Sequence, residues 1–111
     1  PPMIVTTTPT IEGQEVQRYC GIVFAKVIWW GSIGQTLREL FSREKRIKRM
    51  ELELQHAEEI ALHDLQQKAE ALGANAVLGV TFRVEAGGAG PMALAMMATA
   101  TGTAVVVTPK S

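Results

Sequence analysis

The chain has 111 residues, of which 47% are apolar and 20% charged, a balance typical of one folded domain rather than a disordered segment. Its 11 basic and 11 acidic residues cancel, which excludes a strongly basic protein that holds nucleic acid or anionic membrane through its overall charge. The single cysteine, Cys20, excludes a disulfide within the chain and is typical of a reducing compartment. No basic and apolar leader pattern opens the sequence, so we expect a cytoplasmic protein.

The N-terminal part of the chain predicts two strands. We expect Pro1 and Pro2 to be additions before a natural start at Met3, and residues 3–111 to form a single domain. Residues 3–7 (MIVTT) are rich in β-branched side chains and stop at a Thr-Pro-Thr sequence. A second strand is expected from residue 16 to residue 30, long enough to bend at Gly21 and ended by the Gly-Ser-Ile-Gly sequence of residues 31–34.

A change of period between residues 35 and 72 predicts one long amphipathic helix, because apolar residues recur there at intervals of three and four. Its apolar stripe consists of Met50, Leu54, Ala57, Ala61, Leu65, Ala69 and Leu72. The apolar residues upstream, between residues 37 and 47, either continue this stripe or form a separate short helix. Gly73 stands where a glycine caps a helix in the left-handed conformation, and Asn75 suits the turn that follows.

Two further strands are expected after the helix, at residues 76–85 (AVLGVTFRVE) and 92–108, joined by a glycine-rich loop at residues 86–91. The order is therefore β-β-α-β-β. This order predicts an α+β fold in which one dominant helix packs on an antiparallel or mixed sheet.

The nearly uncharged residues 91–107 are about as long as the shortest membrane spans, roughly 17 residues. Threonines and a glycine interrupt this stretch and it closes on three valines, a pattern that favours the return strand of a hairpin. That strand is apolar on both faces, and one helix is too little to cover both. We therefore expect a second copy to cover part of the sheet, which makes the protein a homo-oligomer.

Four segments resemble the small bacterial YbjQ-like family, whose members carry a heavy-metal-binding label. They are IVTTTPTIEG (residues 4–13), YCGIVFAKV (19–27), HAEEIALHDLQQKAEALGANAVLGV (56–80) and ATATGTAVVV (98–107). The resemblance covers well over half of the chain, and the run from Ala61 through Leu72-Gly-Ala-Asn-Ala-Val is its most specific part.

The resemblance implies a subunit similar to that of dodecin, assembled as a ring, usually a homopentamer, in which extra short strands help to join neighbours. It implies little about activity. Two segments depart from the family pattern. Residues 41–50 are basic and lack the glycines common there, and of the acidic ending expected after residue 80 only Glu85 is present.

Donor side chains for a divalent heavy metal are few. His56 and His63 share one face of the predicted helix, but about 10 Å separates residues seven apart, so one ion cannot join both directly. Glu59 lies between them and could pair with either, with further ligands from another subunit, whereas a solvated helix face is the simpler interpretation. Cys20 has no partner cysteine nearby in sequence and is interpreted as a small buried hydrophobe. Three methionines offer soft sulfur but are interpreted as packing residues: Met92, Met96 and Met97.

A basic run occupies residues 43–49 (REKRIKR), from Arg43 to Arg49, and the aromatic pair Trp29-Trp30 precedes it. Basic and aromatic residues together favour the boundary of a membrane or an acidic partner. The simpler interpretation is a solvated charged face with the tryptophans packed at a subunit joint.

The sequence contains no recognisable Ser-His-Asp set and no phosphate-binding loop, so we expect a protein without enzymatic activity. The leading hypothesis is a bacterial ring-forming homopentamer for binding or scaffolding, with a divalent heavy metal as its one candidate cofactor and no nucleic-acid partner. The alternative is a peripheral adaptor that contacts a membrane surface or an acidic partner through Trp29, Trp30 and the basic run from Arg43 to Arg49.

Overall fold

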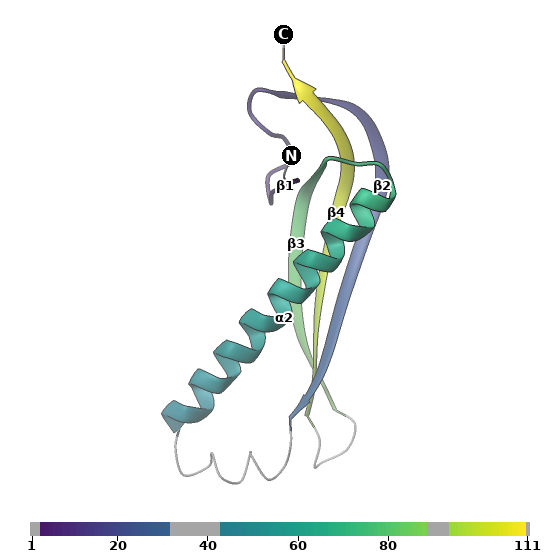
Figure 1. The fold of residues 1–111 in the computed structure, drawn as a ribbon. Coiled ribbons are helices and arrows are strands. Elements are labelled where there is room, and N and C mark those ends of the chain that lie inside the picture. Colours follow the sequence, from purple (N-terminus) through teal and green to yellow (C-terminus); the bar gives the residue numbers. More distant parts are fainter. Residues whose placement is uncertain (1–2, 32–42, 89–93, 111) are drawn as a thin grey trace.

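The computed structural model describes residues 3–31, 43–88 and 94–110, which fold as one helix on a curled sheet (Figure 1). Its elements are β1 (Ile4–Val5), β2 (Gln14–Gly31), α2 (Arg43–Ala71), β3 (Ala76–Gly88) and β4 (Leu94–Pro109). The α+β class and the β-β-α-β-β order predicted from the sequence are confirmed. The predicted helical residues 35–42 lie outside the described part of the chain.

The sheet is mixed, with strand order β1-β3-β4-β2. β1 pairs with β3 in parallel, whereas β4 pairs antiparallel with both β3 and β2. The predicted loop at residues 86–91 was wrong at its start, because β3 continues to Gly88 and pairs there with Leu94. Strand pairing is made by backbone hydrogen bonds, so glycine-rich residues can extend the hairpin.

Strands β2 and β3 bend where extra residues interrupt their pairing with β4. β2 shifts register between Val16 and Arg18 and again between Tyr19 and Gly21. β3 shifts between Leu78 and Thr81, where Gly79 has φ +60°. Such bulges kink a strand and strengthen its twist, which explains how the sheet curls beside the helix. The bend expected at Gly21 is confirmed.

The helix packs on the sheet through the predicted small-residue stripe. Ala57, Ala61, Leu65 and Ala69 are at most 2% exposed. The buried side chains that meet them come mainly from the strands: Val23, Ala25, Val77, Val80, Ala100 and Ala104. Towards its N-terminus α2 leans away from the sheet (Figure 1), and Leu52 there is 67% exposed.

The last predicted member of the stripe, Leu72, departs from it. Helix α2 ends at Ala71, so Leu72 already belongs to the turn and is 44% exposed. Gly73 has φ +83°, its N–H donates to Glu70 O at 2.9 Å, and the N–H of Ala74 donates to Ala69 O at 3.0 Å. This pair of bonds is the Schellman arrangement that ends helices at a left-handed glycine, which confirms the predicted cap.

The side-chain amide of Asn75 pairs with the backbone of β4 as a peptide group of a neighbouring strand would. Its Nδ2 donates to Val107 O at 2.9 Å, and its Oδ1 accepts from Val107 N at 2.8 Å. Its backbone N–H donates to Val105 O at 3.0 Å, and its carbonyl accepts from Ile4 N at 3.4 Å. One asparagine thus joins the end of the helix to both β4 and β1.

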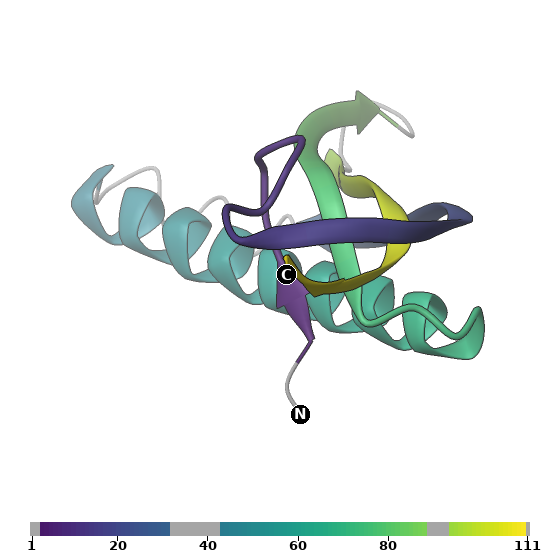
Figure 2. The same cartoon turned by 90° about the horizontal axis from the view of Figure 1, so that it is seen from above.

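The face of the sheet away from α2 is covered at one end only. There the chain between β1 and β2 arches over a small second cluster (Figure 2) made of Ala76, Leu78, Val105 and Val107, with Ile11 and Val16 packed against it. The rest of that face has no covering element among the described residues. In the described part of the chain no helix is both long and apolar enough to cross a membrane.

Replacing Gly102 by alanine is expected to lower the free energy of unfolding by about 1–3 kcal/mol, the usual cost of overpacking. A Cβ on this β4 residue would lie 2.5 Å from Val77 Cγ1 and 3.2 Å from Val80 Cγ2. Both valines are buried and cannot move aside freely. Urea denaturation at fixed protein concentration measures the effect, with Thr103→Ala as the control on the same strand. Equal stability of Gly102→Ala and the wild type would contradict this packing.

Replacing Asn75 by alanine is expected to cost about 1–3 kcal/mol, because the N–H and C=O of Val107 both lose their partner. Gln17→Ala is the control, since it removes a single exposed bond from Gln17 Nε2 to Thr108 Oγ1 and should change stability little. The same urea series compares the two variants. If Gln17→Ala costs as much as Asn75→Ala, the bridging role of Asn75 is wrong.

Candidate functional site

A groove runs between α2 and the outer edge of β2. Its first hollow, of about 430 Å³, is lined by Lys26 on the strand and by His56, Glu59 and His63 on the helix. A second hollow of about 350 Å³ adjoins it and shares His56 and Ile60 with it. All three helical metal candidates named from the sequence therefore lie in one groove.

The donors of the groove are partly engaged with their own neighbours. Asp64 Oδ2 forms an ion pair with Lys68 Nζ at 3.0 Å, and Gln55 Nε2 donates to Glu59 Oε1 at 3.4 Å. Lys26 adds a positive charge to the same hollow. Among the described residues no three His, Cys, Asp or Glu side chains are grouped so that they could hold a metal ion. A zinc-type site takes three or four such ligands, more than these described side chains bring together.

The other sequence candidates do not join this groove. Cys20 is half-buried and packs against the main core beneath the helix, as expected for a small hydrophobe. Met96 and Met97 are half-buried on β4, opposite Trp29 and Ile28 of β2. Met92 lies outside the described residues.

The groove wall formed by β2 is an edge of the sheet, because β4 is the only described strand that pairs with β2. Lys68 Nζ donates to Phe24 O at 2.7 Å, so this carbonyl points away from β4 and towards the helix. Backbone groups alternate sides along a strand, and the N–H and C=O groups of Lys26 and Ile28 therefore point outwards too. Lys68 blocks one position of an edge that otherwise offers several unpaired groups.

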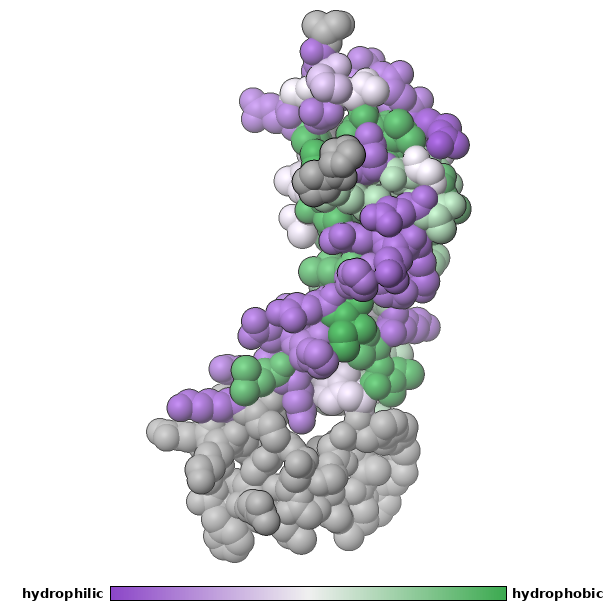
Figure 3. Space-filling model, in the orientation of Figure 1, coloured by the Kyte–Doolittle hydropathy of each residue, from purple (hydrophilic) through white to green (hydrophobic). Residues whose placement is uncertain are grey.

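The open face of the sheet carries large apolar side chains of the same strand. Those of Tyr19, Ile22, Phe24 and Ile28 are 72%, 67%, 54% and 58% exposed. Beside them on β4 lie half-buried threonines, Thr101 opposite Phe24 and Thr103 opposite Ile22. By contrast, the outer surface of α2 is mostly hydrophilic (Figure 3). A row of exposed apolar residues on one strand is unusual for a surface that faces water.

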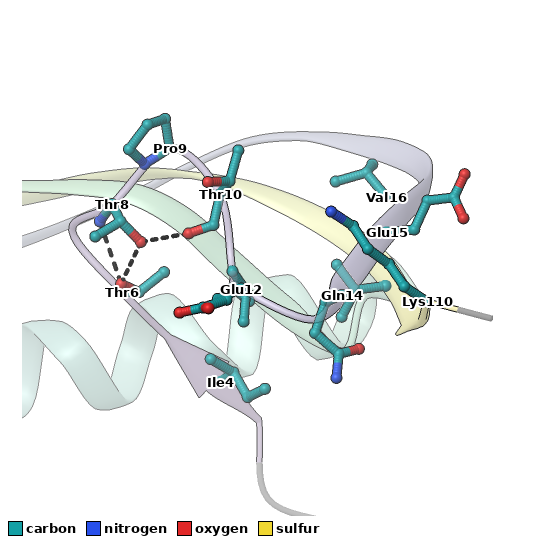
Figure 4. A pocket seen from close by; sticks show the side chains of 12 residues that line it. Ile4, Thr6, Thr8, Pro9, Thr10, Glu12, Gln14, Glu15, Val16 and Lys110 are labelled. Atoms are coloured by element: carbon teal, nitrogen blue, oxygen red, sulfur yellow. Dashed lines mark hydrogen bonds between the residues drawn. The ribbon is translucent and has the colours of Figure 1, made fainter.

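A third hollow, of about 890 Å³, lies beneath the N-terminal arch, where β1, the start of β2 and the end of β4 meet (Figure 4). Alternate threonines stiffen the arch. Thr8 Oγ1 donates to Thr10 O at 2.6 Å, and the hydroxyls of Thr6 and Thr8 are 2.8 Å apart. This hollow was not predicted from the sequence, although the run TTTPT at residues 6–10 indicates a turn.

The segments named for a membrane or acidic partner are described only in part. Residues 43–49 form the first turns of α2, and Lys48 is exposed. Trp29 is half-buried and lines the groove beside His56. The side chain of Trp30 lies outside the described part. The contact with a membrane or acidic partner stays a prediction.

The described residues define a class: a small α+β domain in which helix α2 packs on a curled mixed sheet, with hollows beside the helix and beneath the N-terminal arch. The chain belongs to a family described as "putative heavy-metal-binding", whose model matches residues 3–108. The resemblance found in the four sequence segments is thereby confirmed.

Curated relatives agree with this assignment. UPF0145 proteins of Listeria monocytogenes and Listeria innocua are 44% identical over 109 residues, which cover 95% of this chain and 96% of theirs. A UPF0145 protein of Listeria ivanovii matches to the same extent. These relatives carry no assigned activity in their names.

A solved structure shows the same fold. It is the crystal structure of a protein of unknown function of the DUF74 family from Pediococcus pentosaceus. The two chains superpose with a TM-score of 0.68 over 96% of this chain and 98% of that one, at 16% sequence identity. This likeness concerns the fold alone.

Proposed function

We propose that the protein is a non-enzymatic binding or scaffolding protein of the cytoplasm that works as a ring of identical copies. The observation that carries this proposal is the row of exposed apolar side chains on β2, of which Ile22 and Ile28 are 67% and 58% exposed. Leaving such a row in water costs about 25 cal/mol for each Å² that a partner would cover.

The unpaired edge of β2 adds a second reason for association. The backbone groups of Lys26 and Ile28 that point outwards gain hydrogen bonds if a strand of another copy lies beside them. The opposite edge of the sheet is β1, which has only two residues. Because the two edges differ, a contact from the β1 side of one copy to β2 of the next runs head to tail. Such contacts form a ring when the rotation from copy to copy closes, which is the arrangement proposed here.

The metal part of the proposal concerns the groove beside α2. His56 and His63 flank Glu59, and each pair of neighbours offers two donors on consecutive turns of the helix. In the proposed ring a third ligand comes from a neighbouring copy or from water, as zinc-type sites require. The family's description supports a metal as the ligand.

The assembly is tested by multi-angle light scattering on the eluting protein. One copy has a mass of 12.0 kDa, so a ring of five is expected at about 60 kDa (five times 12.0). Ile22→Asp is expected to reduce the mass, because it places a charge in the proposed contact. Leu52→Asp is the matched control on α2, since both leucine and isoleucine are 67% exposed.

A single mass of one copy at all concentrations would contradict the ring. So would an equal loss of mass in Ile22→Asp and Leu52→Asp, because the contact would then not lie on β2. Circular dichroism of both variants checks that they remain folded.

Metal binding is tested by calorimetric titration of the assembled protein with zinc. Binding should weaken by roughly tenfold or more in the double variant His56→Ala/His63→Ala, because each of the two donor pairs then loses its histidine. Gln67→Ala is the control, since Gln67 lines the same hollow without being a usual ligand of zinc. No heat of binding by the wild type at micromolar zinc would contradict the metal part and leave the ring untouched.

A further inference from the structure

The hollow beneath the N-terminal arch has an apolar floor and a charged rim. Ile4, Ile11, Val16 and Val107 supply the apolar part of its lining. Three of these four belong to the second core cluster or pack against it, so the floor is held in place from below. Its volume of about 890 Å³ lies within the range usual for small-ligand sites, roughly 300–1,000 Å³.

The arch that forms one wall is fixed by its own hydrogen bonds. The Thr8 hydroxyl donates its one hydrogen bond to Thr10 O. The Thr6 hydroxyl is therefore the donor in its bond to Thr8 Oγ1. Thr6 Oγ1 also accepts from Thr8 N at 3.2 Å. Backbone bonds from Val80 N to Thr6 O and from Gly79 N to Thr8 O tie the arch to β3. The wall is therefore preformed, and the Thr6 and Thr8 hydroxyls already have partners.

Two groups of opposite charge remain at the hollow. Figure 4 shows the Glu12 carboxylate on the side of Ile4 and the Lys110 side chain running back towards the arch, whereas the Glu15 carboxylate points away. Lys110 is placed by its backbone N–H, which donates to Gly13 O at 2.9 Å. Across the described residues, neither the Glu12 nor the Lys110 side chain has a hydrogen bond or an ion pair.

We propose that this hollow binds a small zwitterion with an apolar body, an apolar amino acid or dipeptide, between Glu12 and Lys110. The Glu12 carboxylate takes the ligand's ammonium group, and the Lys110 ammonium takes its carboxylate. The apolar side chains of the ligand lie on Ile4, Ile11, Val16 and Val107. One charge of each sign in the same lining as an apolar floor matches this ligand class better than a simple anion or cation. The site goes beyond the proposed ring and metal function and does not depend on either.

Four probes are titrated into the full-length protein. Two are zwitterions, L-leucine and L-leucyl-L-leucine, and two are blocked forms of the dipeptide, N-acetyl-leucyl-leucine and leucyl-leucine amide. The readout is the NMR shift of the methyl groups of Ile4, Ile11, Val16 and Val107. We expect a dissociation constant of roughly 0.1–1 mM for the better of the two zwitterions, as ligands of this size allow. Each blocked peptide is expected to bind roughly two- to fivefold more weakly, since one exposed charge pair is lost.

Two variants assign each charge to its partner. Glu12→Gln should bind leucyl-leucine and its acetylated form with equal affinity, because the ligand's ammonium group can no longer form an ion pair with residue 12. Lys110→Met should bind leucyl-leucine and its amide equally for the corresponding reason. Glu15→Gln is the matched control and should leave all four titrations unchanged, because Glu15 points away from the hollow.

The proposal is overturned if none of the four probes shifts these methyl groups at about 10 mM, well above the expected constant. It is also overturned if the blocked peptides bind as tightly as the free one. An effect of Glu15→Gln as large as that of Glu12→Gln would overturn it too, because the attraction would then come from general charge. Whichever of leucine and leucyl-leucine binds with the lower dissociation constant shows whether the ligand is a free amino acid or a dipeptide.

Discussion

The close packing of one small-residue helix face on one face of the sheet determines most of this structure. Ala57, Ala61 and Ala69 allow α2 to approach the strands, and Gly102 leaves room for Val77 and Val80 within the same core. Helix α2 covers only part of one sheet face before it leans away. The arch covers one end of the other face. The remainder, the row of apolar residues on β2, is left without cover by any described residue.

The sequence predicted the elements well because their signals are local. The stripe of α2 has helical spacing and Gly73 marks its end, so both were found without tertiary information. The extension of β3 to Gly88 was missed because it depends on pairing with β4 and on no side-chain pattern. The role of Asn75 was underestimated for a related reason. Its partner, Val107, lies 32 residues away in the chain, and no local sequence pattern predicts the two hydrogen bonds between them.

The surfaces were predictable to different degrees. The helix period alone placed His56, Glu59 and His63 on one face. All three line the same hollow of the groove, and their ligand stays a proposal. The Lys68 bond to Phe24 O joins residues 44 apart, so the blocked position on β2 was beyond sequence reasoning. The two-sided apolar pattern noticed in residues 92–108 has its counterpart on the paired strand, where Ile22 and Phe24 are the exposed members. The arch hollow needs both ends of the chain to meet, which is purely a property of the fold.

The central claim is that β2 is completed by a second copy of the chain. Hydrogen exchange followed by NMR at several protein concentrations tests it most directly, at the amides of Ile22, Lys26 and Ile28. These groups point to the edge of the sheet and have no strand partner among the residues that the structure describes. The account predicts that their exchange slows as concentration rises, while the amides of Val23 and Ala25, which face β4, stay protected throughout. Fast exchange of the outward amides at every concentration would contradict it.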